Sequence, residues 1–189
     1  MSIEMTAPRT GYLPTLFDGR TLKILALISM LIDHTGAALF PELEWMRWVG
    51  RMAFPIYCFL LTEGALHTKD IRRYLLRLLI FAAVSEVPFD LALMHGRLPY
   101  LKHQNVFFTL AIGVLMIWIC EYIRMRLPES YAGLFCVAVM IAAAGLAELL
   151  EVDYHARGIL MIGALYLFRP WPWMKYLAAG YILFWMGGK

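Results

Sequence analysis

An Asp33-His34 pair stands inside an apolar stretch that runs from Leu22 to Phe40. A charged or titratable side chain near the centre of a bilayer costs roughly 2.5 to 3.5 kcal/mol on the insertion scale, so it is retained mainly where it lines an interior site. Histidine is the side chain best suited to proton transfer near neutral pH. The pair therefore predicts a membrane enzyme or a proton pathway. The structural alternative is that His34 only bonds neighbouring helices to one another.

A cation precedes this histidine at a helical spacing. Lys23 and His34 are eleven residues apart, which on an ideal helix is ~16 Å and about three turns. Both side chains are therefore expected on nearly the same face, with the cation at the cytoplasmic entrance and the imidazole deep in the membrane. Adjacent helical residues do not face each other, so no bond between Asp33 and His34 is assumed. Asp33 could instead orient a neighbouring helix or hold charge.

The densest group of positive charges follows the second apolar stretch and contains Lys69, Arg72, Arg73 and Arg77. Membrane topology and attraction to anionic lipid account for Lys69 and Arg72 without a specific ligand. Arg73 and Arg77 lie four residues apart and run into the membrane. We therefore expect these two guanidinium groups to reach a phosphate or a buried carboxylate.

The second apolar stretch carries polar residues at both ends. Arg51 falls at the outer end, and Glu63 and His67 share a helix face at the inner end by their four-residue spacing. Pro55 within the stretch removes a backbone donor and frees a carbonyl, so a kink is expected there.

The third apolar stretch ends with Glu86 and Asp90 on one helix face. Two carboxylates on an intramembrane face need a cation, a proton or water, and Arg51 at the same predicted level is the expected cation. His103 and Asn105 open the next helix, and Asn105 is a good N-cap. These residues, together with Glu63, are predicted to form a substrate-binding or structural polar site.

Metal ligation is not expected. The three cysteines, Cys58, Cys120 and Cys136, lie in apolar segments without the spacing of a disulfide pair or a metal site. We interpret them as small core residues. The acidic segment 148–155 could ligate a cation but lacks a specific spacing.

The composition is that of an integral membrane protein. Of 189 residues, 61% are hydrophobic and 16% are charged, against roughly 45 to 50% and 25% in soluble domains, and the mean hydropathy is +0.65. The net charge of +3 is small and its basic residues are spread along the chain. A nucleic-acid partner is therefore not expected.

The apolar stretches predict an all-α, polytopic membrane helical bundle of about seven transmembrane helices, with a range of six to eight. The sixth is short, and the brief connections favour antiparallel neighbours. Most Lys and Arg residues fall on the side of the N-terminus, which is therefore predicted to be cytoplasmic. A polar segment 1–21 without a cleavable signal precedes a single transmembrane domain, 22–189. The expected spans are 22–40, 48–66, 74–94, 105–123, 131–150, 157–168 and 173–187.

Four motifs in this order resemble the TraX family, which is named for the F-pilin acetylase of conjugative plasmids. They are LKILALISMLIDHTGA, GRMAFPIYCFLLTEG, HTKDIRRYLLRLLIFAAVSEVPFDL and HQNVFFTLAIG. The likeness is close over 22–115 and looser over the rest of the chain. The spacing from Lys23 to His34 also resembles the basic-residue-to-histidine spacing at the start of the large transmembrane acyltransferase superfamily.

The resemblance implies a bacterial inner-membrane acetyltransferase with acetyl-CoA as co-substrate. His34 is then the catalytic candidate with Asp33 beside it, and the phosphates of coenzyme A would meet the cations Lys23, Arg72, Arg73 and Arg77. The expected partners are membrane lipid and an acetyl acceptor, either the N-terminal amine of a pilin-like peptide or an envelope molecule.

Two other classes of function stay open. One is a proton-coupled membrane transporter, and the other is a non-enzymatic membrane assembly factor. Against the transporter, no internal repeat is visible in the sequence. The transporter's relay would consist of Asp33, His34, Glu63, Glu86 and Asp90.

Overall fold

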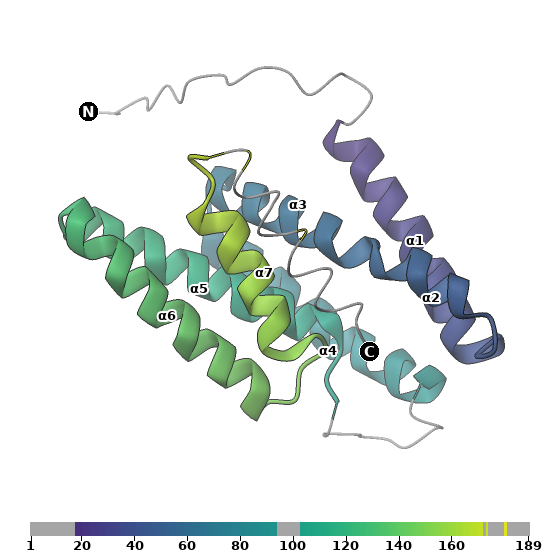
Figure 1. Cartoon of the computed structure of the whole chain (residues 1–189). Coiled ribbons are helices and arrows are strands. Elements are labelled where there is room, and N and C mark those ends of the chain that lie inside the picture. Colours follow the sequence, from purple (N-terminus) through teal and green to yellow (C-terminus); the bar gives the residue numbers. More distant parts are fainter. Residues whose placement is uncertain (1–17, 94–102, 172, 174–179, 181–189) are drawn as a thin grey trace.

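The computed structural model describes residues 18–93, 103–171, 173 and 180, and this part of the chain is helical (Figure 1). Its only β interaction is an isolated bridge between Gln104 and Val152. The predicted all-α class is confirmed. The helices are α1 (Gly19–Leu39), α2 (Glu44–Arg51), α3 (Ala53–His67), α4 (Ile71–Leu93), α5 (Val106–Arg126), α6 (Glu129–Leu149) and α7 (His155–Leu167).

Within the described residues, three helices are long and apolar enough to cross a membrane: α1, α5 and α6. The helix α7 is apolar but shorter, as predicted for the sixth stretch. The predicted span 173–187 lies almost wholly outside the described residues. The number of seven spans and the cytoplasmic N-terminus stay predictions.

The first helix begins earlier than its apolar stretch because of a local cap. The carboxylate of Asp18 accepts hydrogen bonds from the backbone N–H groups of Arg20 and Thr21 at 2.9 and 2.8 Å, as an N-cap aspartate does. The first turn of α1 therefore falls inside the predicted polar segment 1–21.

The expected kink at Pro55 is instead an interruption of the helix. One helix ends at Arg51 and the next begins at Ala53, so Pro55 is the third residue of α3. Proline has no N–H for the carbonyl four residues earlier, which is that of Arg51, and its ring crowds that carbonyl. In the first turn of α3 a missing N–H costs nothing, since those donors have no helical partner.

Glycines allow α1 and α2 to pack closely. A Cβ added to Gly36 would lie 2.7 Å from the Cβ of Met46, and one added to Gly50 would overlap the side chain of Asp33. Small residues at such crossings let helix backbones approach each other. The α2 helix is thereby fixed beside the residue that precedes His34.

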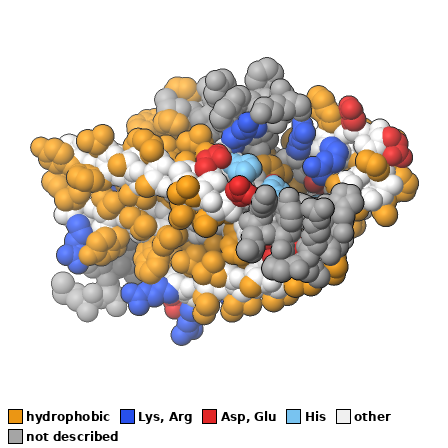
Figure 2. Space-filling model, turned by 90° about the horizontal axis from the view of Figure 1, so that it is seen from below, with side chains coloured by type: hydrophobic (Ala, Val, Ile, Leu, Met, Phe, Trp, Pro, Cys, Tyr) orange, Lys and Arg blue, Asp and Glu red, His pale blue; other side chains and the backbone are white. Residues whose placement is uncertain are grey.

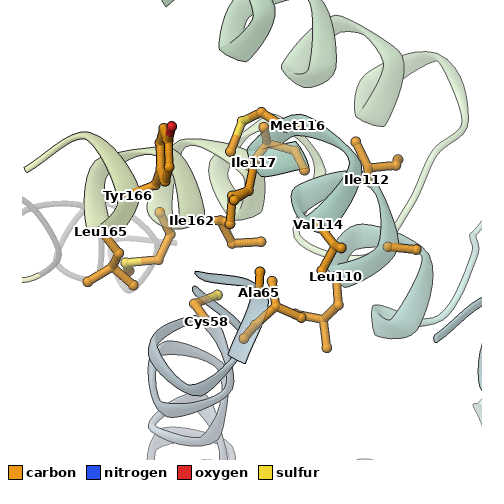
Figure 3. Close-up of a cluster of buried hydrophobic side chains, with 14 of the residues drawn as sticks. Cys58, Ala65, Leu110, Ile112, Val114, Met116, Ile117, Ile162, Leu165 and Tyr166 are labelled. Atoms are coloured by element: carbon orange, nitrogen blue, oxygen red, sulfur yellow. The ribbon is translucent and has the colours of Figure 1, made fainter. Parts of the chain in front are cut away.

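The hydrophobic core lies between α3, α5 and α7 (Figure 3). Val114 and Ile117 of α5 face Ile162 and Leu165 of α7, with Cys58 of α3 nearby. All three cysteines are free and buried. Their interpretation as core residues is confirmed.

The polar residues gather at two ends of this bundle. We call the end where α4 ends and α5 begins the His34 end, and the end where α3 meets α4 the basic end. Because α4 has 23 residues, the two ends are roughly 35 Å apart along that helix.

Candidate functional site

A cavity of about 340 Å³ lies at the His34 end, between α1, α2, α3, α4, the start of α5 and the loop before α7. Phe54, Phe89 and Phe107 supply part of its apolar wall. A few polar groups in an otherwise apolar, aromatic cavity are typical of a binding site. The polar side chains that line it are Asp33, His34, Tyr57, Ser85, Asn105, Asp153 and Tyr154.

His34 and Asp33 point in different directions from α1, as their adjacency predicted. His34 lines the cavity and is exposed, whereas Asp33 is half-buried against α2. The guanidinium of Arg47 donates to the Asp33 carboxylate at 2.7 Å and to the Asp33 carbonyl at 3.4 Å. Asp33 therefore ties α2 to α1 through a charged hydrogen bond, and it still borders the cavity.

The expected pairing of Arg51 with Glu86 is not present among the described residues. Arg51 lies close enough to Asp33 for their charges to attract each other, because it ends α2, which packs on α1. Glu86 accepts from Asn105 instead, at 3.2 Å from the backbone N–H and again from the side-chain amide. Asp90 is buried in the same region.

Asn105 combines the two roles that its position suggested. Its side-chain oxygen accepts from the N–H of Phe107 at 3.0 Å, which caps α5. Its amide nitrogen donates to the carbonyl of Ala82 at 2.8 Å as well as to Glu86. The cap of α5 is therefore bonded to α4, and both helices are held at the cavity.

The segment before α5 also holds the loop before α7. Gln104 donates to the carbonyl of Glu151 at 3.0 Å and accepts from the N–H of Asp153 at 2.8 Å. His103 consequently lies with its Nε2 3.8 Å from an Asp153 carboxylate oxygen. The Asp153 carboxylate is close enough to Asp33 and His34 for their charges to interact. Figure 2 shows acidic and histidine side chains gathered on one face.

Burial and neighbouring positive charge shift the pKa of Asp153 in opposite directions. Burial raises the pKa of its carboxyl above the usual range, and the neighbouring imidazole of His103 counteracts that rise. Burial also raises the pKa of the Tyr154 hydroxyl far above its usual value. Tyr154 therefore stays protonated at neutral pH and can donate a hydrogen bond in the cavity.

The loop that carries these residues has an unusual backbone. Glu151, Tyr154 and His155 have φ values of 49°, 63° and 46°, in a left-handed region that bulky residues rarely adopt. The ring of Tyr154 stacks on Phe54 with 3.7 Å between ring centroids. Strained backbone that the surroundings hold in place is common at functional sites.

The basic end holds most of the predicted cofactor-binding residues. A hollow of about 440 Å³ there is lined by Lys69, Arg73 and Arg77. Arg73 also forms an ion pair with Asp70 at 3.0 Å. Arg72 does not line the hollow, because its guanidinium lies over the ring of Trp118 at 5.6 Å.

Two further predicted residues lie apart from His34, the cofactor-binding candidate Lys23 and the polar-site candidate Glu63. Lys23 is exposed on α1 and lines neither the cavity nor the hollow. Glu63 lies near the basic end, 3.8 Å from the Nδ1 of His67. The shared face of Glu63 and His67 is confirmed, whereas Glu63 does not join the polar site at the His34 end.

Comparison with known proteins decides the family. A family model described as TraX protein matches residues 18–187. The chain belongs to the TraX family. No solved structure matches it.

Two curated proteins are similar to this TraX chain. One is the "Probable fimbrial assembly protein FimC, serogroup H1" of Dichelobacter nodosus, 30% identical over 138 residues, which cover 64% of the chain and 56% of the relative. The other is an "Uncharacterized protein" of Rickettsia prowazekii (strain Madrid E), 32% identical over 121 residues, with 64% and 44% covered. The TraX chain spans about half the length of these curated relatives.

Sequence reasoning missed several groups that this TraX member brings to the cavity. Tyr57 and Ser85 carried no signal beyond their apolar surroundings, and Arg47, which bonds Asp33 beside the cavity, was not among the predicted site residues. Asp153 and Tyr154 could have been found, because the alternation of spans puts the loop before α7 at the same end as Asn105. Within the described residues, no group of three His, Cys, Asp or Glu side chains could hold a metal ion.

Proposed function

We propose that this TraX family member is a membrane acetyltransferase in which His34 removes a proton from the acceptor while acetyl-CoA donates the acetyl group. The observation that carries the proposal is the position of His34. It lies on α1, a helix long and apolar enough to cross a membrane, and it opens on the cavity. A titratable side chain in such a segment favours the hypothesis of a functional site.

The transfer can be written as one balanced sequence. The nitrogen or oxygen of the acceptor attacks the carbonyl carbon of the thioester, and its proton passes to His34. The C–S bond then breaks, and the thiolate of coenzyme A takes the proton from His34, which returns to its neutral form. Holding both substrates together lowers the barrier by proximity, and a two-step route through an acetyl-histidine would use the same residue.

The surroundings of His34 suit this reaction. The protonated hydroxyl of Tyr154 can donate to the thioester oxygen as negative charge develops there. Asp33 is engaged by Arg47, so its contribution is to hold α1 and α2 around the histidine. Asp153 supplies a second carboxylate near the imidazole.

Residue chemistry and one relative support the choice of acyl donor and acceptor. The phosphates of coenzyme A fit the cations of the basic end, Lys69, Arg73 and Arg77. The similarity to a probable fimbrial assembly protein favours a pilin-like peptide as the acceptor, with an envelope molecule as the alternative. The corresponding location is the bacterial inner membrane, with the basic end at the cytoplasm.

Binding of acetyl-CoA to the purified full chain tests the proposal. Calorimetry in lipid nanodiscs should show saturable binding, with a dissociation constant between about 1 μM and 1 mM, the usual range of substrate constants. The relative's name also favours a non-enzymatic assembly factor. An assembly factor or a proton-coupled transporter would not bind acetyl-CoA, so the absence of binding would contradict the acetyltransferase.

A further inference from the structure

One face of α4 connects the basic end to the cavity. Arg77, Phe81, Val84 and Pro88 follow one another at spacings of four, three and four residues, which places them along a single stripe of the helix. Phe81 and Val84 in the middle of the stripe are 58% and 65% exposed. We call these four residues the α4 stripe.

Each end of the α4 stripe belongs to one of the two hollows. Arg77 lines the hollow of the basic end, and Pro88 lines the cavity that contains His34. Between them the ring of Phe81 stacks against Phe107 with 6.1 Å between centroids, and Phe107 also lines the cavity. The stripe is therefore a continuous apolar path with a cation at one end.

Pro88 adds a polar feature to this path. A proline inside a helix cannot donate to the carbonyl four residues earlier, which here is the carbonyl of Val84. That oxygen therefore lacks its usual helical donor. A ligand with amide N–H groups along an otherwise apolar chain matches such a surface.

The length of the stripe fits one such ligand. Arg77 and Pro88 are eleven residues apart, or ~16 Å along the helix. The pantetheine arm of coenzyme A has about thirteen bonds from its phosphate to its sulfur. At the reach of an extended peptide chain, roughly 1.2 Å for each bond, the arm spans ~16 Å.

We infer that the α4 stripe holds the pantetheine arm of acetyl-CoA, with the phosphates at Arg77 and the thioester at Pro88 beside the His34 cavity. The inference rests on the proposed function and adds the donor's binding site to it. Lipid chains would cover the same apolar surface, but they do not need the cation, the freed carbonyl and the cavity in this order.

Obstruction of the stripe tests the inference. In the full chain in nanodiscs, Val84→Trp should weaken acetyl-CoA binding at least tenfold. Adenosine 3′,5′-bisphosphate, which lacks the arm, should bind within twofold of wild type. The control is Leu79→Trp, at another exposed apolar position of α4 that lies off the stripe, and it should leave both ligands unaffected.

A second measurement covers the case in which the tryptophan variant does not fold. Val84→Cys should react with a maleimide, and acetyl-CoA should protect it whereas adenosine 3′,5′-bisphosphate should not. The three native cysteines are buried, so they can stay in place, and Leu79→Cys serves as the unprotected control.

The outcomes separate this inference from the proposed function. If wild type binds acetyl-CoA but Val84→Trp binds it equally well, or Val84→Cys is not protected, lipid covers the stripe and the inference is overturned alone. If wild type binds no acetyl-CoA, both the inference and the proposed function are contradicted.

Discussion

The two polar ends of the molecule are built in opposite ways. At the His34 end the side chains come from several elements and are bonded across them, Asp33 to Arg47 and Glu86 to Asn105. At the basic end the cations lie on α4 and the turn before it, and the side chain of Arg73 is 85% exposed. The first end depends on tertiary packing, whereas the second depends mainly on local sequence.

This difference matches two different tasks. Reacting atoms must be held to within a fraction of an ångström, which requires side chains locked by their neighbours. A group of long cations can bind phosphate in many orientations, because charge attraction needs little geometric precision. The comparison therefore agrees with the proposed function, in which the His34 end carries the chemistry and the basic end anchors the donor.

The largest effect is expected from His34→Ala, which tests the task assigned to the His34 end. Loss of the proton acceptor should lower acetyl transfer at least about 100-fold, the lower part of the range for general base catalysis. Acetyl-CoA binding should stay within several-fold of wild type. Transfer is measured as acetyl-CoA consumption by membranes that contain the chain.

His67→Ala is the matched control, since it removes an exposed histidine at the other end. It should keep nearly full activity. If His34→Ala retains a substantial fraction of the wild-type rate, His34 is not the base, and the distinction between the two ends loses its chemical meaning.

The next effect concerns the packing that holds the His34 end together. Gly50→Val should destabilise the protein by about 1 to 3 kcal/mol, the usual cost of overpacking, because a side chain there would overlap Asp33. Thermal unfolding in detergent measures this loss. Gly133→Ala on α6, where a Cβ would meet nothing within 4 Å, should not destabilise. Equal melting temperatures for all three proteins would show that α1 and α2 do not pack as described.

The local part of this architecture was predictable from sequence. The fourth expected span, 105–123, corresponds to α5 because Asn105 is a cap that acts within its own turn. The divergence of Asp33 and His34 followed from helix geometry. The cations of the basic end were identified as a group because they are close together along the chain.

The tertiary part was not predictable. Arg47 bonds Asp33 only because Gly50 lets α2 approach α1, and no pattern in the chain reports that contact. The partner predicted for Arg51 was wrong for the same reason, because the helix break at Met52 lets α2 run in a different direction from α3. Asp153 reaches the cavity through the bridge of Gln104 to the loop before α7, a pairing between distant segments.

A smaller effect is expected at the basic end. Arg77→Ala should raise the dissociation constant of acetyl-CoA about three- to tenfold, or roughly 0.7 to 1.4 kcal/mol, because an exposed cation is screened by water and salt. Arg72→Ala should change it less than twofold, since that guanidinium lies on Trp118. Calorimetry in nanodiscs compares the two variants. An equal change in both variants, or no change in either, would mean that the cations of the basic end serve membrane topology and lipid attraction and do not bind acetyl-CoA specifically.

The smallest effect is a pH dependence at the His34 end, tested by Asp153→Asn. Burial raises the pKa of the folded carboxyl above its ordinary value of 3.8, so the folded protein holds this proton more tightly than the unfolded chain. Stability therefore falls as pH rises from that value through the raised pKa. The attraction of His103 makes this loss small.

Asparagine keeps the oxygen that accepts from the Tyr154 N–H but cannot ionise. The melting temperature of Asp153→Asn should therefore equal that of wild type near about pH 4 and exceed it increasingly towards about pH 7. Thermal unfolding across this range measures the difference in melting temperature between the two proteins. The other carboxylates titrate alike in both proteins, so their contribution cancels from that difference. A wild type that gains stability over the variant as pH rises would mean that the ionised carboxylate is favoured by its surroundings. The attraction of His34 and His103 would then exceed the effect of burial on the Asp153 carboxylate. Charges at the His34 end would be stabilised by pairing with each other.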